Sequence, residues 1–206
     1  MPRPRAFDET AALRAALDLF WSHGFAATSL RDLQDAMGLS SASLYNAFGD
    51  KHALFRRCLD HYLDQSMRAR ISVCDTLPPR EAIVAFLAGI VARSLEDARG
   101  CLMVNTAVEL APHDPAIAAV IAERLGELEA FFLRSLRRGQ RDGSISGQVQ
   151  VPDVARLLVA SVLGLRVLGR TRPDPALLHG VARQAIALLE PDGAGAAAAR
   201  STQPIG

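Results

Sequence analysis

Apolar residues recur with the spacing of an α-helix along nearly the whole chain, and this periodicity limits the fold more than any other feature. Sustained alternation of β-branched residues and the Asn-Gly pair of a tight hairpin are both missing from the sequence. The sequence therefore predicts an all-α protein of about nine helices. We expect them at about 8–23, 29–37, 41–48, 51–74, 79–97, 101–110, 115–142, 154–169 and 176–189.

Bulk composition narrows the class of protein. Half of the 206 residues are hydrophobic, which argues against a disordered or fibrous chain. The net charge is only +1, so any contact with nucleic acid must depend on where the basic residues lie. The longest apolar run, 157–169, contains Arg166 and is shorter than the roughly 20 residues that cross a bilayer. With no apparent secretory signal and three scattered cysteines, we expect a cytoplasmic protein without membrane contact.

The segment 28–51 has the form of a helix-turn-helix: two short helices joined by a turn that contains Gly38. Leu44 and Phe48 are the apolar residues of the second helix, and its other face carries small or polar side chains without a carboxylate. Such a face can enter a major groove about 12 Å wide. The helix starts near Thr28 and Ser40 offer backbone N–H groups to phosphates. A plain helical hairpin is the alternative, and the basic arm with Arg3 and Arg5 favours DNA over it.

Residues 7–55 resemble the DNA-binding domain of the TetR family of bacterial regulators. The matching residues are Leu19-Phe20, Gly24-Phe25, Thr28, Ala36-Met37-Gly38-Leu39-Ser40, Leu44-Tyr45, Phe48 and Lys51-His52-Ala53-Leu54-Phe55. The resemblance implies that Thr28, Tyr45 and Lys51 contact phosphates. It also implies groove contacts from Ser41, Ser43 and Asn46. Asn46 stands where many members have His, and Ala42 where Gly is common, so the operator sequence stays open.

The same resemblance implies a homodimeric regulator, by the family's usual mode a repressor, that binds palindromic operator DNA and is released by a small molecule. We expect a DNA-binding domain over 1–50 and an effector-binding and dimerisation domain over 51–190. A Gly/Ala/Ser-rich tail over 191–206 is predicted to be disordered. The last two helices are apolar on much of their circumference, and we expect the dimer to form through them. Closure of the monomer core is the alternative for these helices.

The segment 100–109 is similar to a motif of one TetR subgroup, some members of which respond to reactive electrophiles or small toxic organic compounds. Cys101 is the candidate sensor because it lies at a predicted helix start, although a small core residue would look the same. Asn105 and Glu109 share a helix face and could supply a pocket's polar groups, unless Glu109 pairs with a surface arginine. The predicted effector pocket comprises Phe86, Cys101, Met103, Asn105, Glu109, Phe131 and Arg166.

Other chemistries find little support in the sequence. Cys58 and His61 form one C-x-x-H pair, and the remaining histidines are scattered, so we predict no metal site and no cofactor. A Gly-rich phosphate loop and a G-x-S-x-G elbow are both missing, which argues against an enzyme. A helical module that binds another protein through its helix pair remains as the second alternative.

Overall fold

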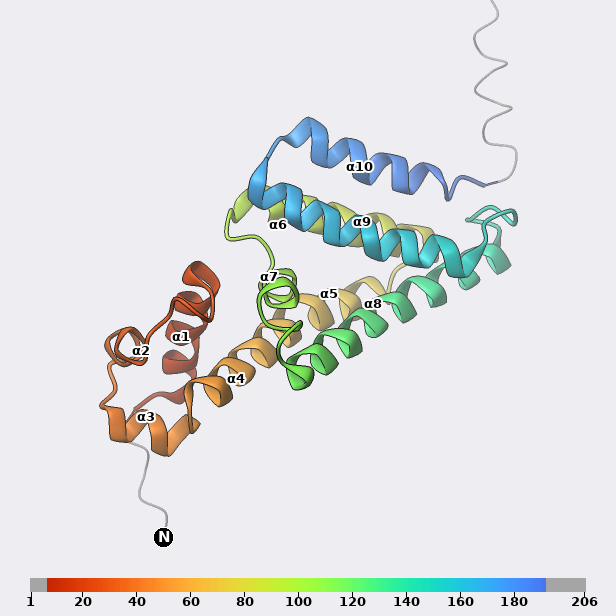
Figure 1. Cartoon of the computed structure of the whole chain (residues 1–206). Coiled ribbons are helices and arrows are strands. Elements are labelled where there is room, and N and C mark those ends of the chain that lie inside the picture. Colours follow the sequence, from red (N-terminus) through yellow and green to blue (C-terminus); the bar gives the residue numbers. More distant parts are fainter. Residues whose placement is uncertain (1–6, 192–206) are drawn as a thin grey trace, which may run out of the picture. The chain divides into compact units, whose positions relative to one another are not determined.

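The computed structural model describes residues 7–191, and every regular element among them is helical (Figure 1). The helices are α1 (Glu9–His23), α2 (Leu30–Met37), α3 (Ser41–Phe48), α4 (Lys51–Leu63), α5 (Ala69–Cys74), α6 (Pro79–Glu96), α7 (Leu102–Glu109), α8 (Pro115–Asp142), α9 (Val151–Thr171) and α10 (Pro175–Ala187). A π-helical segment, η1 (Asp64–Arg68), joins α4 to α5 without a break. With α4, η1 and α5 taken as one continuous helix, the described chain has nine helices, which confirms the predicted all-α class.

The chain forms two compact units. The first unit comprises residues 7–68 and 101–122 of the described chain, and the second comprises 69–100 and 123–191. The predicted functional division between residues 50 and 51 is a different kind of boundary and stays a prediction. The predicted arm residues Arg3 and Arg5, and residues 192–206 of the predicted tail, lie outside the described residues.

Side-chain caps define the short helices of the first unit. The Ser29 hydroxyl accepts the Asp32 N–H, and the Asp32 carboxylate accepts the Ser29 N–H, which together form a capping box at the start of α2. Gly38 ends α2 in the left-handed conformation at φ 63°. Ser40 and Asp50 cap α3 and α4 through their side-chain oxygens. The caps explain why helices of eight residues keep fixed ends here.

The core of the first unit is aromatic and aliphatic. Phe20 of α1 meets Phe55 of α4 edge-on, with 5.0 Å between ring centroids. Leu33 of α2 and Leu44 of α3 are both fully buried. Each of the three N-terminal helices therefore contributes apolar side chains to this core, and the opposite face of α3 is left for other contacts.

The π-helical segment was not predicted from the sequence. Residues 64–68 follow α4 directly, and Met67 is the buried residue among them. In a π turn the backbone hydrogen bond joins residues i and i+5 instead of i and i+4. The turn therefore contains one residue more than a turn of α-helix. The hydrophobic periodicity of the sequence predicts a single helix from residue 51 to about residue 74, and the wide turn leaves that overall length unchanged.

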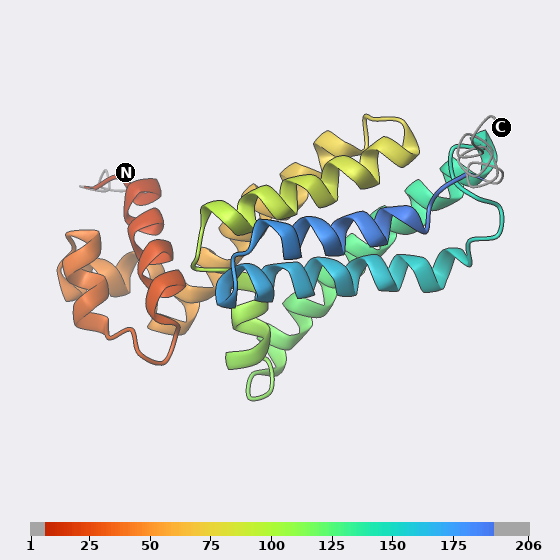
Figure 2. The same ribbon diagram turned by 90° about the horizontal axis from the view of Figure 1, so that it is seen from above.

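In the second unit α6, α9 and α10 lie side by side (Figures 1 and 2). Phe86 of α6 packs on Phe131 and Phe132 of α8, with ring centroids 5.2 and 5.5 Å away. Gly169 of α9 faces Ser94 of α6, where a Cβ atom would lie 2.5 Å from the Ser94 Cβ. The missing side chain at Gly169 thus permits the close approach of α9 to α6.

Candidate nucleic-acid interface

The outer face of α3 has the composition predicted for a reading helix. Ser41, Ala42, Tyr45 and Asn46 are exposed, whereas Leu44 and Phe48 are buried. Tyr45 keeps 48% of its surface exposed, which is unusual for a large aromatic residue in this chain. The face carries hydroxyl and amide groups without a carboxylate, so it can approach phosphates and base edges without charge repulsion.

Ser40 and Ser43 lie at the start of this helix. The Ser40 hydroxyl accepts the Ser43 N–H at 3.2 Å, and the two hydroxyl oxygens are 3.0 Å apart. Ser40 is exposed and Ser43 is half-buried. Both hydroxyls therefore serve the helix start first, and their predicted DNA contacts stay predictions.

Thr28 lies before the cap of α2 and has only 2% of its surface exposed. Its hydroxyl donates to the Gly24 carbonyl oxygen at 2.7 Å. A phosphate oxygen accepts hydrogen bonds only, so the Thr28 hydroxyl must leave Gly24 before it can donate to DNA. The predicted phosphate contact of Thr28 stays a prediction, and the structure adds this competing partner.

Lys51 begins α4, and its ammonium group lies 4.3 Å from the centroid of the Phe25 ring. The Phe25 ring also packs against Phe20 and Phe55, with centroid distances of 6.1 and 5.1 Å. Phe25 thus connects the turn after α1 with the aromatic core and supports the lysine side chain.

Two carboxylates near the end of α7 bind the turn after α1 and the start of α4. The Glu109 carboxylate accepts the Ala26 N–H at 2.8 Å and the Phe25 N–H at 3.2 Å. His52, next to Lys51, pairs through Nε2 with the Asp114 carboxylate. Sequence analysis missed both contacts. No periodicity or motif indicates a bond between residues that are 84 positions apart.

Asp114 also caps α8, and its pKa is held below 3.8. The main cause is the hydrogen bond from the Ile117 N–H to its carboxylate at 3.0 Å, followed by the bond to His52. A carboxylate with these donors is stable in its ionised form. The Asp114 side chain therefore holds the end of the α7–α8 loop in place as an anion.

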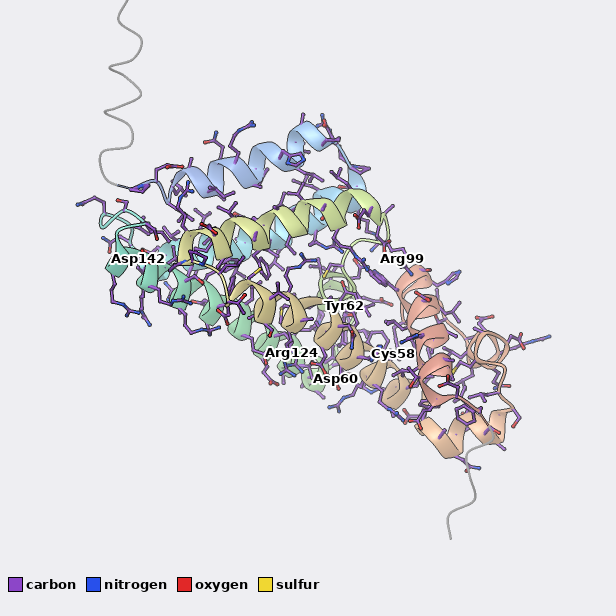
Figure 3. All side chains as sticks on the ribbon, turned by 180° about the vertical axis from the view of Figure 1, so that it is seen from behind. Cys58, Asp60, Tyr62, Arg99, Arg124 and Asp142 are labelled. Atoms are coloured by element: carbon purple, nitrogen blue, oxygen red, sulfur yellow. The ribbon has the colours of Figure 1, made fainter. Side chains whose placement is uncertain are left out.

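The α7 residues of the predicted effector pocket belong to the first unit. Met103 is buried, and Cys101 and Asn105 are half-buried. The Tyr62 hydroxyl lies 3.6 Å from the Cys101 Sγ, and Cys101 is the N-cap of α7. Glu109 binds backbone amides, whereas the sequence left open a pocket role or a pairing with arginine. Figure 3 labels Tyr62 on α4, one turn after Cys58.

The other three predicted pocket residues belong to the second unit. Phe86 and Phe131 are fully buried in the aromatic cluster with Phe132. Arg166 is 4% exposed, and its guanidinium donates to the Ser94 hydroxyl at 3.0 Å and to the Gly100 carbonyl oxygen. Cys101 and its neighbours on α7 therefore belong to a different unit from these three, and the pocket itself stays a prediction.

The three cysteines differ in their surroundings. Burial raises the pKa of the Cys58 thiol to about 12, and burial also raises the pKa of Cys74. Thiols with raised pKa values are poor nucleophiles at neutral pH. Cys101 is the more accessible of the three, because Cys58 and Cys74 are buried.

One face of α9 is exposed and apolar. Leu157 and Val167 keep 46% and 47% of their surface exposed, and the exposed Ala160 and half-buried Gly164 lie between them. A Cβ atom at Gly164 would meet no atom within 4 Å. Leu188, just after α10, is 49% exposed. The α9 face differs from the exposed Val73 on α5 and Val108 on α7, because it carries two large exposed apolar side chains along one helix.

Comparison with known sequences identifies the family. The model described as "Bacterial regulatory proteins, tetR family" matches residues 12–58, and the model described as "Tetracyclin repressor-like, C-terminal domain" matches residues 79–186. The chain belongs to the TetR family. The family consists of transcriptional regulators, which confirms the predicted non-enzymatic class. None of the helices in residues 7–191 is both long and apolar enough to span a membrane.

Two curated TetR relatives cover most of the chain. The HTH-type transcriptional repressor ComR of Escherichia coli (strain K12) is 33% identical over 172 residues, which cover 82% of each chain. The uncharacterized HTH-type transcriptional regulator YezE of Bacillus subtilis (strain 168) is 32% identical over 180 residues, 84% of this chain and 92% of its own.

A solved structure of a TetR-family protein carries DNA. It is a cysteine mutant of the TetR family transcriptional regulator CifR, complexed with 26bp double-strand operator DNA. That protein is 37% identical to this chain with a TM-score of 0.80, over 90% of this chain and 98% of its own. The reduced form of E. coli NemR has a TM-score of 0.77 at 17% identity. The match covers 89% of this chain and 98% of NemR, and it shows that the two share the fold.

Proposed function

We propose that this chain is a transcriptional repressor that binds a palindromic operator as a homodimer and is released by a small organic or electrophilic effector. The observation that carries the proposal is the exposed face of α3, where Ser41, Tyr45 and Asn46 project from a helix whose other face is buried. Side chains of this kind donate and accept hydrogen bonds at base edges and phosphates. The complex of CifR with operator DNA, a relative 37% identical to this chain, supports operator binding by this chain.

Phosphate binding by this protein would come from both side chains and helix starts. Lys51 and Tyr45 supply an ammonium and a phenol group near α3. The capped starts of α2 and α3 supply N–H groups with the positive end of the helix dipole. These groups fix the register of the protein on DNA, and Ser41 and Asn46 are left to read the sequence.

The apolar face of α9 supports dimerisation through the last two helices. Ala160 and Gly164 lie between Leu157 and Val167, and small residues allow two helices to approach closely. A two-fold dimer would repeat the same face on both partners and place two α3 helices on successive turns of DNA. That geometry is the reason why we expect a palindromic operator.

Cys101 is our candidate for the reactive part of the effector response. The thiol is half-buried at the start of α7 and has the Tyr62 hydroxyl as a neighbour, whereas Cys58 and Cys74 are buried with raised pKa values. An electrophile would add to the Cys101 sulfur, and the thiol proton would pass to solvent or to the leaving group. The bulk added beside α7 would favour a state with lower DNA affinity.

The first experiment measures binding to the DNA upstream of the protein's own gene, by fluorescence anisotropy with excess nonspecific competitor. We expect affinity at least about a thousandfold above nonspecific binding and a steep fall with rising salt. If this fragment competes no better than random DNA, genome-wide selection of bound fragments provides the operator. Failure to bind any DNA at low salt would contradict the proposal and favour a protein-binding helical module.

A second experiment tests the effector. The complex with operator DNA is treated with a thiol-reactive alkylating compound, using the wild type, Cys101→Ser and, as the matched control, Cys74→Ser. We expect release from DNA for the wild type and Cys74→Ser but not for Cys101→Ser. Equal release of all three would exclude Cys101 as the reactive residue.

A further inference from the structure

We propose that Glu109 is a positioning residue for operator binding, a role that rests on the proposed function. Its carboxylate accepts the backbone N–H groups of Phe25 and Ala26, at 3.2 and 2.8 Å. A carboxylate with two N–H donors forms charge-assisted hydrogen bonds, which are the stronger kind. The turn after α1 is thereby fixed to the C-terminal end of α7.

Gly24 makes this contact possible. The residue adopts φ 85°, a conformation that side chains disfavour, and a Cβ atom there would lie 3.1 Å from the Glu109 Oε2. The turn therefore combines an open approach for the carboxylate with two N–H groups that point toward it. Both features concern the same side chain, which is half-buried and lies 84 residues away in the sequence.

Two residues with predicted phosphate contacts rest on the same turn. The Thr28 hydroxyl donates to the Gly24 carbonyl oxygen, and the Lys51 ammonium group makes a cation–π contact with the Phe25 ring. A shift of the turn would move both groups at once. Glu109 would thus act on DNA binding through the position of Lys51 and of the Thr28 backbone, without touching DNA itself. The Thr28 hydroxyl leaves the Gly24 carbonyl oxygen when it donates to a phosphate.

Asp114 provides a second attachment between the same parts of the first unit. Its carboxylate pairs with His52, the neighbour of Lys51, and caps the start of α8. Glu109 and Asp114 therefore hold the turn after α1 and the start of α4 from the two ends of the α7–α8 loop. A displacement of α7 relative to the turn after α1 must stretch or break the bonds of Glu109.

The direction in which operator affinity changes when the Glu109 charge is removed distinguishes a positioning role from a purely electrostatic one. Glu109 carries a negative charge, and loss of a negative charge by itself strengthens attraction to phosphates on every sequence. A positioning residue has the opposite effect on the specific site, because the turn loses its fixed geometry. Glu109→Gln is suited to the test, since its amide has only one oxygen to accept the two N–H groups.

The test compares wild type, Glu109→Gln and the charge-matched control Glu81→Gln, an exposed site on α6. We expect Glu109→Gln to bind the operator about tenfold more weakly, with nonspecific binding unchanged or stronger, and the control to match wild type. Amide hydrogen exchange at Phe25 and Ala26 should rise, while exchange at Ala116 and Ile117 stays unchanged. Equal or tighter operator binding by Glu109→Gln would overturn the proposal.

Folding and function are kept apart by two further measurements. Glu109→Asp retains the charge but is one methylene shorter, so it should also weaken operator binding while the helical circular dichroism signal is kept. Loss of that signal in both variants would overturn the positioning role, because Glu109 would then hold the fold itself. If the wild type binds no DNA while its Phe25 and Ala26 amides are protected, the proposed function fails and the contact stands.

Discussion

Two exposed helix faces of this protein lack a carboxylate at their centre, and they differ in polarity. The face of α3 presents Ser41, Tyr45 and Asn46, whereas the face of α9 presents Leu157, Gly164 and Val167. Hydroxyl and amide groups remain hydrated until a ligand replaces their water, but exposed leucine and valine gain free energy from any cover. The α3 face therefore suits a polar, charged partner, and the α9 face suits another apolar helix face.

The largest effect is expected from Gly164→Arg, which breaks the apolar face. A side chain at Gly164 meets open space in one chain, so the variant should fold, but the charge would be buried in the proposed dimer. We expect a monomer by analytical ultracentrifugation and operator affinity reduced at least about a hundredfold. Gly126→Arg on α8 is the matched control, because a side chain there also meets open space. A dimeric Gly164→Arg would contradict dimerisation through this face.

The next effect concerns sequence reading by α3. Asn46→Ala removes an exposed amide and should weaken operator binding about tenfold to a hundredfold, the cost of one good base contact. Nonspecific binding should hardly change, and base preference at one operator position should relax. Anisotropy titrations against operators with single base-pair changes measure both results. Equal losses on operator and random DNA would assign Asn46 to the phosphate backbone instead.

A smaller and more uniform effect is expected from Lys51→Met. The substitution keeps a long apolar chain against the Phe25 ring but removes the ammonium group. Affinity should fall several-fold on all DNA sequences, and the slope of log affinity against log salt should decrease by about one. An unchanged salt dependence would show that Lys51 contacts no phosphate.

The smallest effect is expected on the melting temperature, from loss of the capping box at the start of α2. Hydrogen bonds from the Ser29 hydroxyl and N–H lower the pKa of Asp32 below 3.8. A lowered pKa means that the carboxylate stabilises α2 above pH 3.8 and that this contribution is lost as the pH falls through the lowered value. Asp32→Ala should therefore melt slightly below wild type at pH 7, and the two melting temperatures should converge as the pH falls below the lowered pKa of Asp32. A constant difference at every pH would exclude the capping charge as the cause.

Much of the fold could be predicted because its signals are local. Gly38, Ser40 and Asp50 mark helix ends through their own backbone or side-chain preferences, and the structure uses each of them in that way. The exposed face of α3 follows from the burial of Leu44 and Phe48, one helical turn apart. These features need no knowledge of distant partners.

The missed features depend on partners that are distant in sequence. Glu109 and Phe25 meet only after α7 packs in the first unit, so their spacing in sequence carries no signal. The hydrogen bond from the Thr28 hydroxyl to the Gly24 carbonyl oxygen has no signal in the sequence either, and the phosphate contact of Thr28 stays a prediction. The predicted pocket combines α7 residues of the first unit with Phe86, Phe131 and Arg166 of the second unit, and it stays a prediction.

The π-helical segment η1 has a consequence for how this chain tolerates changes in length. Residues 64–68 hold one residue more than an α turn needs, and Gln65 within them is exposed. Deleting Gln65 would convert the wide turn into an ordinary one, while Tyr62 before it and Cys74 after it keep their inward faces. At this point of the long helix, one residue can be deleted without rotating the helix on either side relative to the residues it packs against. Elsewhere in the helix the same deletion would turn every following side chain by about 100°.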